Sequence, residues 1–271
     1  MKPKNILLLL SLSASLATLP PLGAAEPKPL QVLLITGGCC HDYAQQKDLL
    51  KKGLEERAHV VVTQVHTNDR STKARFALYE NADWAKGYDV VIHDECSADV
   101  KDLPFVQNIL AAHKGGVGAV NLHCAMHSYR TGTPDWFEFI GLQSTGHGPQ
   151  EPIAISFVES PGHPTTRGLA NWTTIKEELY NNVKVFPGAQ PLARGKQVVK
   201  RKDGTEKTDE AVVAWANQYG QGRVWSTTIG HNNGTVGDSR YLDLVTRGVL
   251  WTAGKLSDDG KPLPGYAAQA K

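Results

Sequence analysis

Residues 31–42 read QVLLITGGCCHD, and this stretch decides the fold class of the 271-residue chain. The first six residues form a short apolar run without charge, which is typical of a buried strand. Two glycines end the run and predict a tight loop, in which His41 and Asp42 follow directly. A buried strand that enters a polar loop is a common start of an α/β unit, so we expect an α/β protein.

The segments that follow alternate between helical and strand patterns. Apolar runs predict strands over residues 60–65, 89–92 and 118–122, and helical spacing predicts helices over residues 43–57 and 104–113. Because strands and helices alternate, the crossovers should be right-handed and the sheet parallel, with helices on both faces.

The second half of the chain has a different pattern. Apolar runs predict further strands over residues 153–158, 211–216 and 222–229. The last two should form a β-hairpin, because YGQG at residues 219–222 is a turn signal. Residues 241–252 predict a closing helix that ends at Gly254. We therefore expect a mostly parallel central sheet flanked by helices, with a C-terminal β-hairpin and a closing helix.

The two ends of the chain are expected to lie outside the folded domain. Two early lysines, an uncharged apolar run over residues 6–19 and small residues up to Ala25 form the pattern of a secretory signal peptide. The run is too short for a comfortable membrane span, so we expect cleavage near Ala25 and a periplasmic or secreted protein without membrane insertion. The domain should cover residues 26–256, and the polar tail 257–271 should be loosely held.

The charge balance argues against large anionic partners. The chain has 29 basic and 27 acidic residues, and two of the lysines lie in the signal segment. The mature protein would therefore be close to neutral, which gives no electrostatic footprint for nucleic acid or an anionic membrane. The lysine-rich residues 196–207 also contain acidic residues, and we interpret them as a solvated hairpin or loop.

Histidines gather where strands are predicted to end. Ligands of open α/β sheets bind beyond the carboxyl ends of the strands. Six of the ten histidines lie at strand ends or in glycine-rich loops: His41, His93, His123, His127, His147 and His231. Such a group, with a carboxylate, can bind a metal, move protons or hold sugar hydroxyls. Each histidine alone could equally bond backbone carbonyls in a crowded loop.

A metal ion is suggested by composition, because the chain has no HxH, HExxH or paired CxxC motif. We assign His123 and His231 as candidate ligands of a divalent transition metal such as zinc, manganese or nickel. The glycines at residues 115–118 separate a helix from a strand and lack the placement of a nucleotide-binding loop, so no nucleotide is expected.

Residues 177–180 (EELY) supply the candidate carboxylate. Either glutamate could reach the histidines, and Tyr180 could stack on a sugar ring or donate a hydrogen bond. The alternative is an ordinary solvated acidic pair, and periodicity does not decide between the two.

The four cysteines leave their pairing open. Cys39 and Cys40 are adjacent and can hardly pair with each other in ordinary geometry, whereas Cys96 and Cys124 follow two different predicted strands. Cys124 also lies where α/β enzymes often carry a nucleophile. That turn needs small flanking residues, which are absent here, so a buried structural thiol is favoured.

Several short motifs, weak singly but specific in their order, resemble those of the ThuA-like (trehalose utilisation) proteins. They are Gly37-Gly38 with His41-Asp42, residues 118–125 with His123, Phe139-Ile140-Gly141 before Gly146-His147, His163-Pro164 with Gly168-Leu169, residues 177–180, residues 219–224, Gly230-His231, and Arg247-Gly248 with Trp251 and Gly254. Glu177 stands where the family usually has aspartate, and Cys39-Cys40 is not expected in the first loop of that family.

The resemblance implies a class I glutamine amidotransferase-like, flavodoxin-like fold and a role in carbohydrate catabolism. It supports five catalytic candidates: His41, His123, His147, Glu178 and His231. We expect an enzyme that acts on a small-molecule or oligosaccharide substrate, a sugar or keto-glycoside, by isomerisation, hydration or elimination, or hydrolysis. His123 and His231 would bind metal or polarise a carbonyl, and His41 or Glu178 would be the base. Candidate substrate contacts are Asp42, Tyr180, Asn232 and Trp136.

Two alternatives remain. The first is a carbohydrate-binding or accessory protein without turnover, which would use the histidines and the rings of Trp136, Trp172 and Trp225. The second is an amidotransferase relative that uses Cys124, although the glycines that flank the amidotransferase cysteine are missing. The substrate and the oligomeric state are left open by the sequence.

Overall fold

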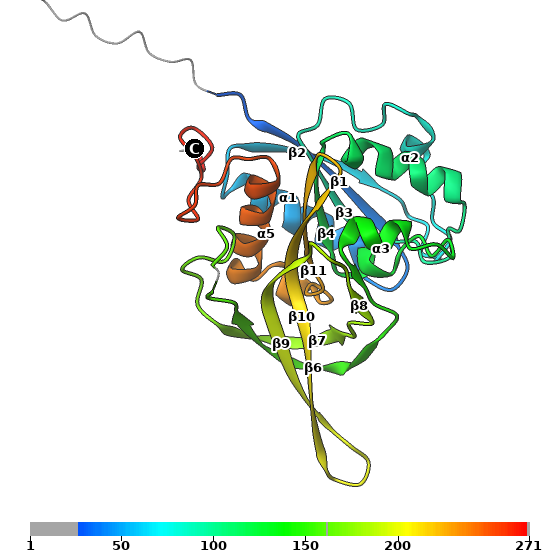
Figure 1. Cartoon of the computed structure of the whole chain (residues 1–271), viewed down its shortest axis with the longest axis vertical. Coiled ribbons are helices and arrows are strands. Elements are labelled where there is room, and N and C mark those ends of the chain that lie inside the picture. Colours follow the sequence, from blue (N-terminus) through cyan, green and yellow to red (C-terminus); the bar gives the residue numbers. More distant parts are fainter. Residues whose placement is uncertain (1–26, 161, 270–271) are drawn as a thin grey trace, which may run out of the picture.

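The computed structural model describes residues 27–160 and 162–269, so the expected signal peptide lies outside the described residues. A nine-stranded sheet runs through the centre in the order β2-β1-β3-β4-β11-β10-β9-β6-β7 (Figure 1). A second sheet has two short strands, β5 (Leu142–Gln143) and β8 (Lys184–Val185). Short helical turns are η1 (Ala77–Glu80), η2 (His123–His127) and α4 (Asn233–Val236).

The first half of the sheet is parallel, as expected. Its strands are β1 (Leu30–Gly38), β2 (Val60–His66), β3 (Val90–Cys96), β4 (Gly118–Leu122) and β11 (Gly222–Thr227). One face is covered by α1 (Tyr43–Glu55) and α5 (Ser239–Thr252), and the other by α2 (Leu103–Lys114) and α3 (Asp135–Ile140). Both faces are therefore buried, which explains why β1 is apolar without alternation.

The close packing of α5 depends on a glycine. A Cβ at Gly248 would lie 2.7 Å from the indole of Trp225 on β11, so a larger residue would push the helix away from the sheet. This contact explains the Arg247-Gly248 motif of the closing helix as a packing requirement.

The second half of the sheet is antiparallel, and the expectation of a mostly parallel sheet was wrong. Its strands are β6 (His147–Phe157), β7 (Trp172–Tyr180), β9 (Gln190–Lys200) and β10 (Glu206–Tyr219). Four of the eight strand pairings are parallel and four are antiparallel, so the sheet is mixed. The error arose because β7 and β9 were not predicted as strands and β6 and β10 are longer than their apolar parts.

The charged segment at residues 196–207 belongs to the β9–β10 hairpin, whose tip projects from the body of the molecule (Figure 1). This confirms its interpretation as a solvated hairpin. Residues 257–269, expected to be loosely held, form turns against the body, where the N–H of His59 donates to the carbonyl of Tyr266 at 3.0 Å. Within the described residues, no helix is long and apolar enough to cross a membrane.

The antiparallel half curls over the end of the parallel half. Although β7 is four strands away from β11 in the sheet order, β7 contacts β10 and α4. This curl places Glu177 and Glu178 beside the loop that follows β11, and so beside the carboxyl ends of the parallel strands.

Candidate functional site

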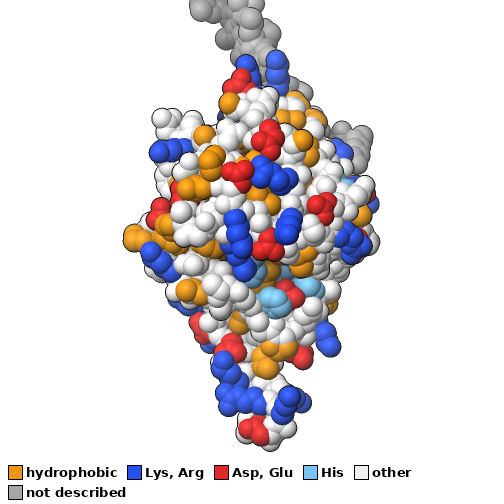
Figure 2. Space-filling view, turned by 90° about the vertical axis from the view of Figure 1, so that its right-hand side faces the viewer, with side chains coloured by type: hydrophobic (Ala, Val, Ile, Leu, Met, Phe, Trp, Pro, Cys, Tyr) orange, Lys and Arg blue, Asp and Glu red, His pale blue; other side chains and the backbone are white. Residues whose placement is uncertain are grey.

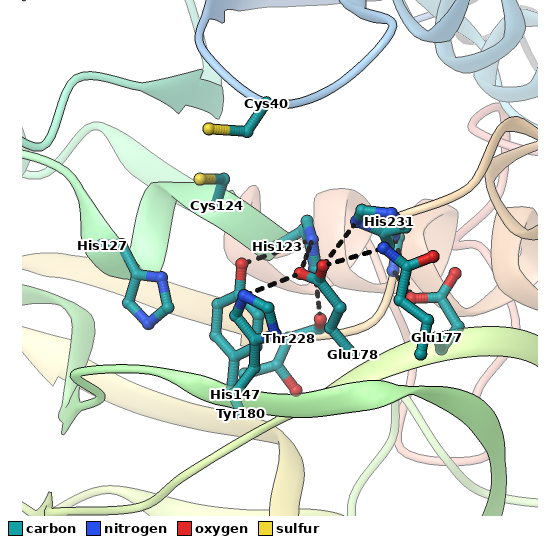
Figure 3. A network of polar contacts seen from close by, with 12 residues as sticks. Cys40, His123, Cys124, His127, His147, Glu177, Glu178, Tyr180, Thr228 and His231 are labelled. Atoms are coloured by element: carbon teal, nitrogen blue, oxygen red, sulfur yellow. Dashed lines mark hydrogen bonds and ion pairs between the residues drawn. The ribbon is translucent and has the colours of Figure 1, made fainter. Parts of the chain in front are cut away.

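A cluster of histidines surrounds Glu178 at the carboxyl ends of the parallel strands. His41 follows β1, His123 follows β4 and His231 follows β11, whereas Glu178 is on β7 and His147 begins β6. Figure 2 shows histidine side chains around an acidic side chain in a hollow above the projecting hairpin, and Figure 3 shows the contacts between them. The strand-end rule thus located the histidines correctly, and the curl of the sheet adds the carboxylate.

His123 is held so that one nitrogen faces the cluster. Its Nδ1 lies 2.6 Å from the carbonyl oxygen of Thr228, which can only accept, so Nδ1 carries the proton. The Nε2 atom then points at Oε2 of Glu178, 3.5 Å away. A backbone carbonyl that fixes the tautomer in this way is the usual outer partner of a metal-binding histidine. His123 also has a positive φ of 41°, uncommon for a residue other than glycine.

His41 and His231 complete a compact set of three imidazoles. The ring of His41 lies 4.6 Å from that of His123 and 4.9 Å from that of His231, measured between centroids. One nitrogen from each of the three rings lies within 4.8 Å of the others. The Nδ1 atom of His231 lies 3.3 Å from Oε1 of Glu178, whereas Nδ1 of His41 is buried without a hydrogen-bond partner. Buried polar atoms normally have a partner, so Nδ1 of His41 is a candidate to contact a ligand.

The charges of the cluster follow from its burial. Burial, with the charges of the neighbouring His123 and His231, lowers the pKa of His41 to about 2. Burial alone would raise the pKa of Glu178, but hydrogen bonds and charge from His123 and His231 outweigh it and hold the pKa below its ordinary value. The hydrogen bond to Glu178 raises the pKa of His231. The cluster therefore has a carboxylate at its centre and a neutral His41 beside it.

His147 is the most accessible member of the cluster. Its side chain is 40% exposed, and its Nε2 atom lies 3.6 Å from Oε2 of Glu178. It stacks on Tyr180, whose hydroxyl is 3.3 Å from Nε2 of His123. A cavity of about 470 Å³ opens beside His147 and Tyr180 and reaches the base of the β9–β10 hairpin. Its size is in the range of small-molecule sites, so a substrate can approach the cluster from this side.

His127 packs behind Tyr180 on the side away from solvent. The two rings are parallel, with centroids 4.2 Å apart, and Nε2 of His127 lies 2.9 Å from the hydroxyl of Ser144. Burial lowers the pKa of His127 to about 3, and the charge of Arg130 acts in the same direction. His127 therefore supports the tyrosine as a neutral ring.

The low pKa of His127 predicts a pH-dependent contribution to stability. The unfolded chain takes up a proton on this histidine below about pH 6.5, whereas the folded protein does not until about pH 3. The contribution of His127 to the free energy of unfolding is thus most favourable above pH 6.5, and it decreases as the pH falls below this value. Replacing His127 with glutamine should reduce the loss of unfolding free energy between pH 7.5 and 5 by about 2 kcal/mol in urea denaturation. A His59→Gln control should leave the loss unchanged, and equal losses in the parent and His127→Gln would contradict the assignment.

Glu177 holds the loop that carries His231. Its carboxylate is fully buried and accepts the backbone N–H groups of Gly230 at 3.4 Å, His231 at 2.9 Å and Asn232 at 3.2 Å. The side chain of Asn232 also donates to the carbonyl of Lys176. The two adjacent glutamates thus have separate tasks: Glu177 positions the loop and Glu178 faces the histidines.

Replacing Glu177 with glutamine should destabilise the protein by about 2–3 kcal/mol, because an amide NH₂ cannot accept from the backbone N–H groups. Urea denaturation would measure the change. The matched control is Glu206→Gln, an exposed glutamate of the hairpin, for which little change is expected. A loss no larger than that of the control would show that the carboxylate does not hold the loop.

Several candidate residues lie outside the cluster. Trp136 is 0% exposed, and its indole N–H donates to the carbonyl of Ala125 in the core, so its assignment as a substrate contact is corrected. The side chain of Asp42 caps α1 and accepts a hydrogen bond from the side chain of Asn233. The side-chain amide of Asn232 donates a hydrogen bond to the carbonyl of Lys176. His93 lies within β3 rather than after it, because that strand continues to Cys96.

The buried neighbours of His93 explain its place in the core. Its ring is hydrogen-bonded to Glu95 and to His113, each at 2.9 Å, on the face of the sheet covered by α2 and α3. Gln150, which donates to Glu178 at 3.2 Å, was not predicted because nothing in the sequence distinguishes it from other strand residues.

The cysteines form two disulfides in the structure, Cys39–Cys40 and Cys96–Cys124. The expectation that the adjacent pair could hardly bond was therefore wrong. Cys40 has a φ of 87°, in the left-handed region, and this backbone turn brings the adjacent side chains together.

Comparisons with known proteins agree with the fold. The family model for trehalose utilisation, ThuA, matches residues 31–252. A ThuA-like protein from Parabacteroides merdae ATCC 43184 is 20% identical with a TM-score of 0.65, over 90% of this chain and 98% of that chain. One from Bacteroides uniformis ATCC 8492 is 16% identical with a TM-score of 0.58, over 85% and 95%.

A protein from Thermoplasma acidophilum, described as part of a GMP synthase, is 9% identical with a TM-score of 0.51, over 83% of this chain and 94% of that chain. At these identities the solved structures show a shared fold, the glutamine amidotransferase-like one. No curated protein sequence matches the chain. The family model covers most of the sequence, and the chain therefore belongs to the ThuA, or trehalose utilisation, family.

Proposed function

We propose that this protein is a carbohydrate-catabolism enzyme that acts on a sugar or keto-glycoside through Glu178 and the surrounding histidines, with the help of a divalent metal ion. The observation that carries the proposal is the arrangement of His41, His123 and His231, whose nitrogens converge beside one carboxylate. The family name, trehalose utilisation, indicates the class of substrate.

The donor atoms fit a metal ion of the zinc, manganese or nickel type. With a proton on Nδ1 donated to the carbonyl of Thr228, Nε2 of His123 faces Oε2 of Glu178 at 3.5 Å, and a proton or a cation between these two atoms would join them. The unpartnered Nδ1 of His41 and a nitrogen of His231 lie within 4.8 Å of the nitrogen of His123. Imidazole and carboxylate ligands suit these metals.

The residues of the cluster can divide the work of proton transfer beside a carbonyl. A bound metal ion would polarise the carbonyl oxygen of the substrate. Glu178 would accept the proton next to that carbonyl, and His147, which is open to the cavity and adjacent to Glu178, would carry it to or from the substrate. His41 is better suited to be a ligand than a base, because burial keeps it neutral and gives it little access to substrate. Isomerisation or elimination would begin with this step, and hydration would end with its reverse.

The alternatives have less support. A glycan-binding protein would need exposed aromatic platforms, but Trp136, Trp172 and Trp225 are all buried. An amidotransferase would need a free thiol at Cys124, which is bonded to Cys96.

The test is a turnover assay with trehalose and its keto derivative, followed by NMR in D₂O on protein loaded with zinc, manganese or nickel. Turnover with deuterium incorporated beside the carbonyl is the expected result. Calorimetric binding of the sugars without any turnover, under all three metals, would instead support the accessory protein.

We also propose that this chemistry takes place outside the cytoplasm, because residues 1–25 have the pattern of a signal peptide. Mass spectrometry of the mature protein should give an N-terminus at or next to residue 26. An intact N-terminus on protein from cytoplasmic extract would contradict export.

A further inference from the structure

The four cysteines gather beside the histidine cluster, and the function proposed above does not use them. Cys39 and Cys40 follow β1, Cys96 ends β3 and Cys124 follows β4. These three strands are neighbours in the sheet, so the four cysteines lie close together at its edge. Cys40 and Cys124 lie on one side of His123 in Figure 3. Three of the four side chains are buried, and Cys40 is exposed.

The sulfurs of the two disulfides lie close to one another. Sγ of Cys39 is 3.4 Å from Sγ of Cys96, although these two atoms belong to different disulfides. The Sγ atoms of Cys39, Cys40 and Cys96 all lie within 4.8 Å of one another, a separation that one metal ion can bridge. Thiolate sulfurs bound to one tetrahedral zinc ion are held by bonds of about 2.3 Å, which requires this kind of crowding.

The backbone also holds Cys39 beside Cys96. The N–H of Cys39 donates to the carbonyl of Cys96 at 3.3 Å, which ties the end of β1 to the end of β3. Gly38 has a φ of 93°, and any Cβ there would collide with that same carbonyl. Cys39, with its neighbour Cys40, should therefore stay beside Cys96 when the disulfides are reduced.

We propose that the reduced cysteine cluster is a second metal site, which binds one thiophilic ion such as Zn²⁺ or Cu⁺ through Cys39, Cys40 and Cys96, with Cys124 as a further thiol beside them. Two molecules of a dithiol reduce the two disulfides: four electrons and four protons pass to the sulfurs, and each dithiol becomes a disulfide. Binding of the ion then releases the thiol protons of its ligands. Soft sulfur ligands favour such ions, whereas the histidine and carboxylate site suits harder ones.

The full chain would be reduced with a dithiol without air, desalted and titrated with Cd²⁺, a spectroscopic probe for thiolate ligands. The expected result is thiolate-to-metal charge-transfer absorption that saturates at one ion per chain, with none in the oxidised protein. Cys40→Ser, at an exposed position, should lose most of this absorption. The His123→Ala, His231→Ala variant should keep it, which separates the cysteine site from the proposed histidine site.

Three results would overturn the proposal. The disulfides could withstand the dithiol in the folded protein, as shown by a thiol count of zero with native circular dichroism. The reduced protein could have four free thiols and show no charge-transfer absorption. Alternatively, the absorption could survive Cys40→Ser and vanish in the double histidine variant. None of these results bears on the turnover assay, so the two proposals fail independently.

Discussion

Replacing His123 and His231 together with alanine is expected to lower the affinity for a divalent metal by more than about 100-fold. Even the outer partners of metal-binding histidines contribute 10–100-fold, and this variant removes two of the proposed ligands and leaves only His41 and Glu178. Elemental analysis and calorimetric titration with zinc, manganese and nickel would measure the change.

His59→Ala is the control, because that histidine contacts residue 265 of the tail and lies away from the cluster. Circular dichroism should show that the double variant is folded. Near-stoichiometric metal in a folded double variant, or no metal in the parent after incubation with all three ions, would remove the metal from the proposal. The histidines would then be groups for proton transfer or sugar contact.

Replacing Glu178 with glutamine is expected to reduce turnover by about 10²–10⁴-fold, the usual contribution of a positioned general base. The amide keeps the shape of the side chain but cannot accept a proton, and it removes the negative charge that faces His123, His147 and His231. Steady-state rates on the keto-glycoside would show the loss in kcat.

Gln150→Ala provides a comparison that keeps the carboxylate and removes its amide donor. We expect a much smaller effect on kcat, because Glu178 retains its three histidine neighbours. A Glu178→Gln variant with parental turnover would show that proton transfer is performed elsewhere, and His147 would be the next residue to test.

The sequence predicted the parts of the fold that are buried on both faces. The strands β1 and β4 are mostly apolar, β11 is buried except for one exposed residue, and α1, α2 and α5 have one apolar face each, so their patterns are visible in the sequence. The placement of His41, His123 and His231 at strand ends followed from the topology rule for such sheets.

The remaining features depend on three-dimensional packing. The strand β9 alternates exposed and buried residues and carries two lysines and an arginine, so it was not distinguished from a loop. The curl that brings Glu178 to the histidines joins segments that are distant in sequence and in sheet order. Trp136 and His93 are buried because of neighbours on α2 and α3, which local sequence does not specify.

The order of strands in the sheet has a consequence for how the protein folds. In the sheet, β11 pairs with β4 on one side and with β10 on the other, so it joins the two halves, and it is the last strand of the sheet in chain order. Gln46 and His231, which are hydrogen-bonded, are separated by 185 positions, so this part of the site closes over a very long loop. During synthesis, the edge of β4 that pairs with β11 therefore stays unpaired until nearly the whole domain has left the ribosome. Pairing of this open edge with other chains would lower the yield of active protein, and a chaperone that covers the edge would raise it.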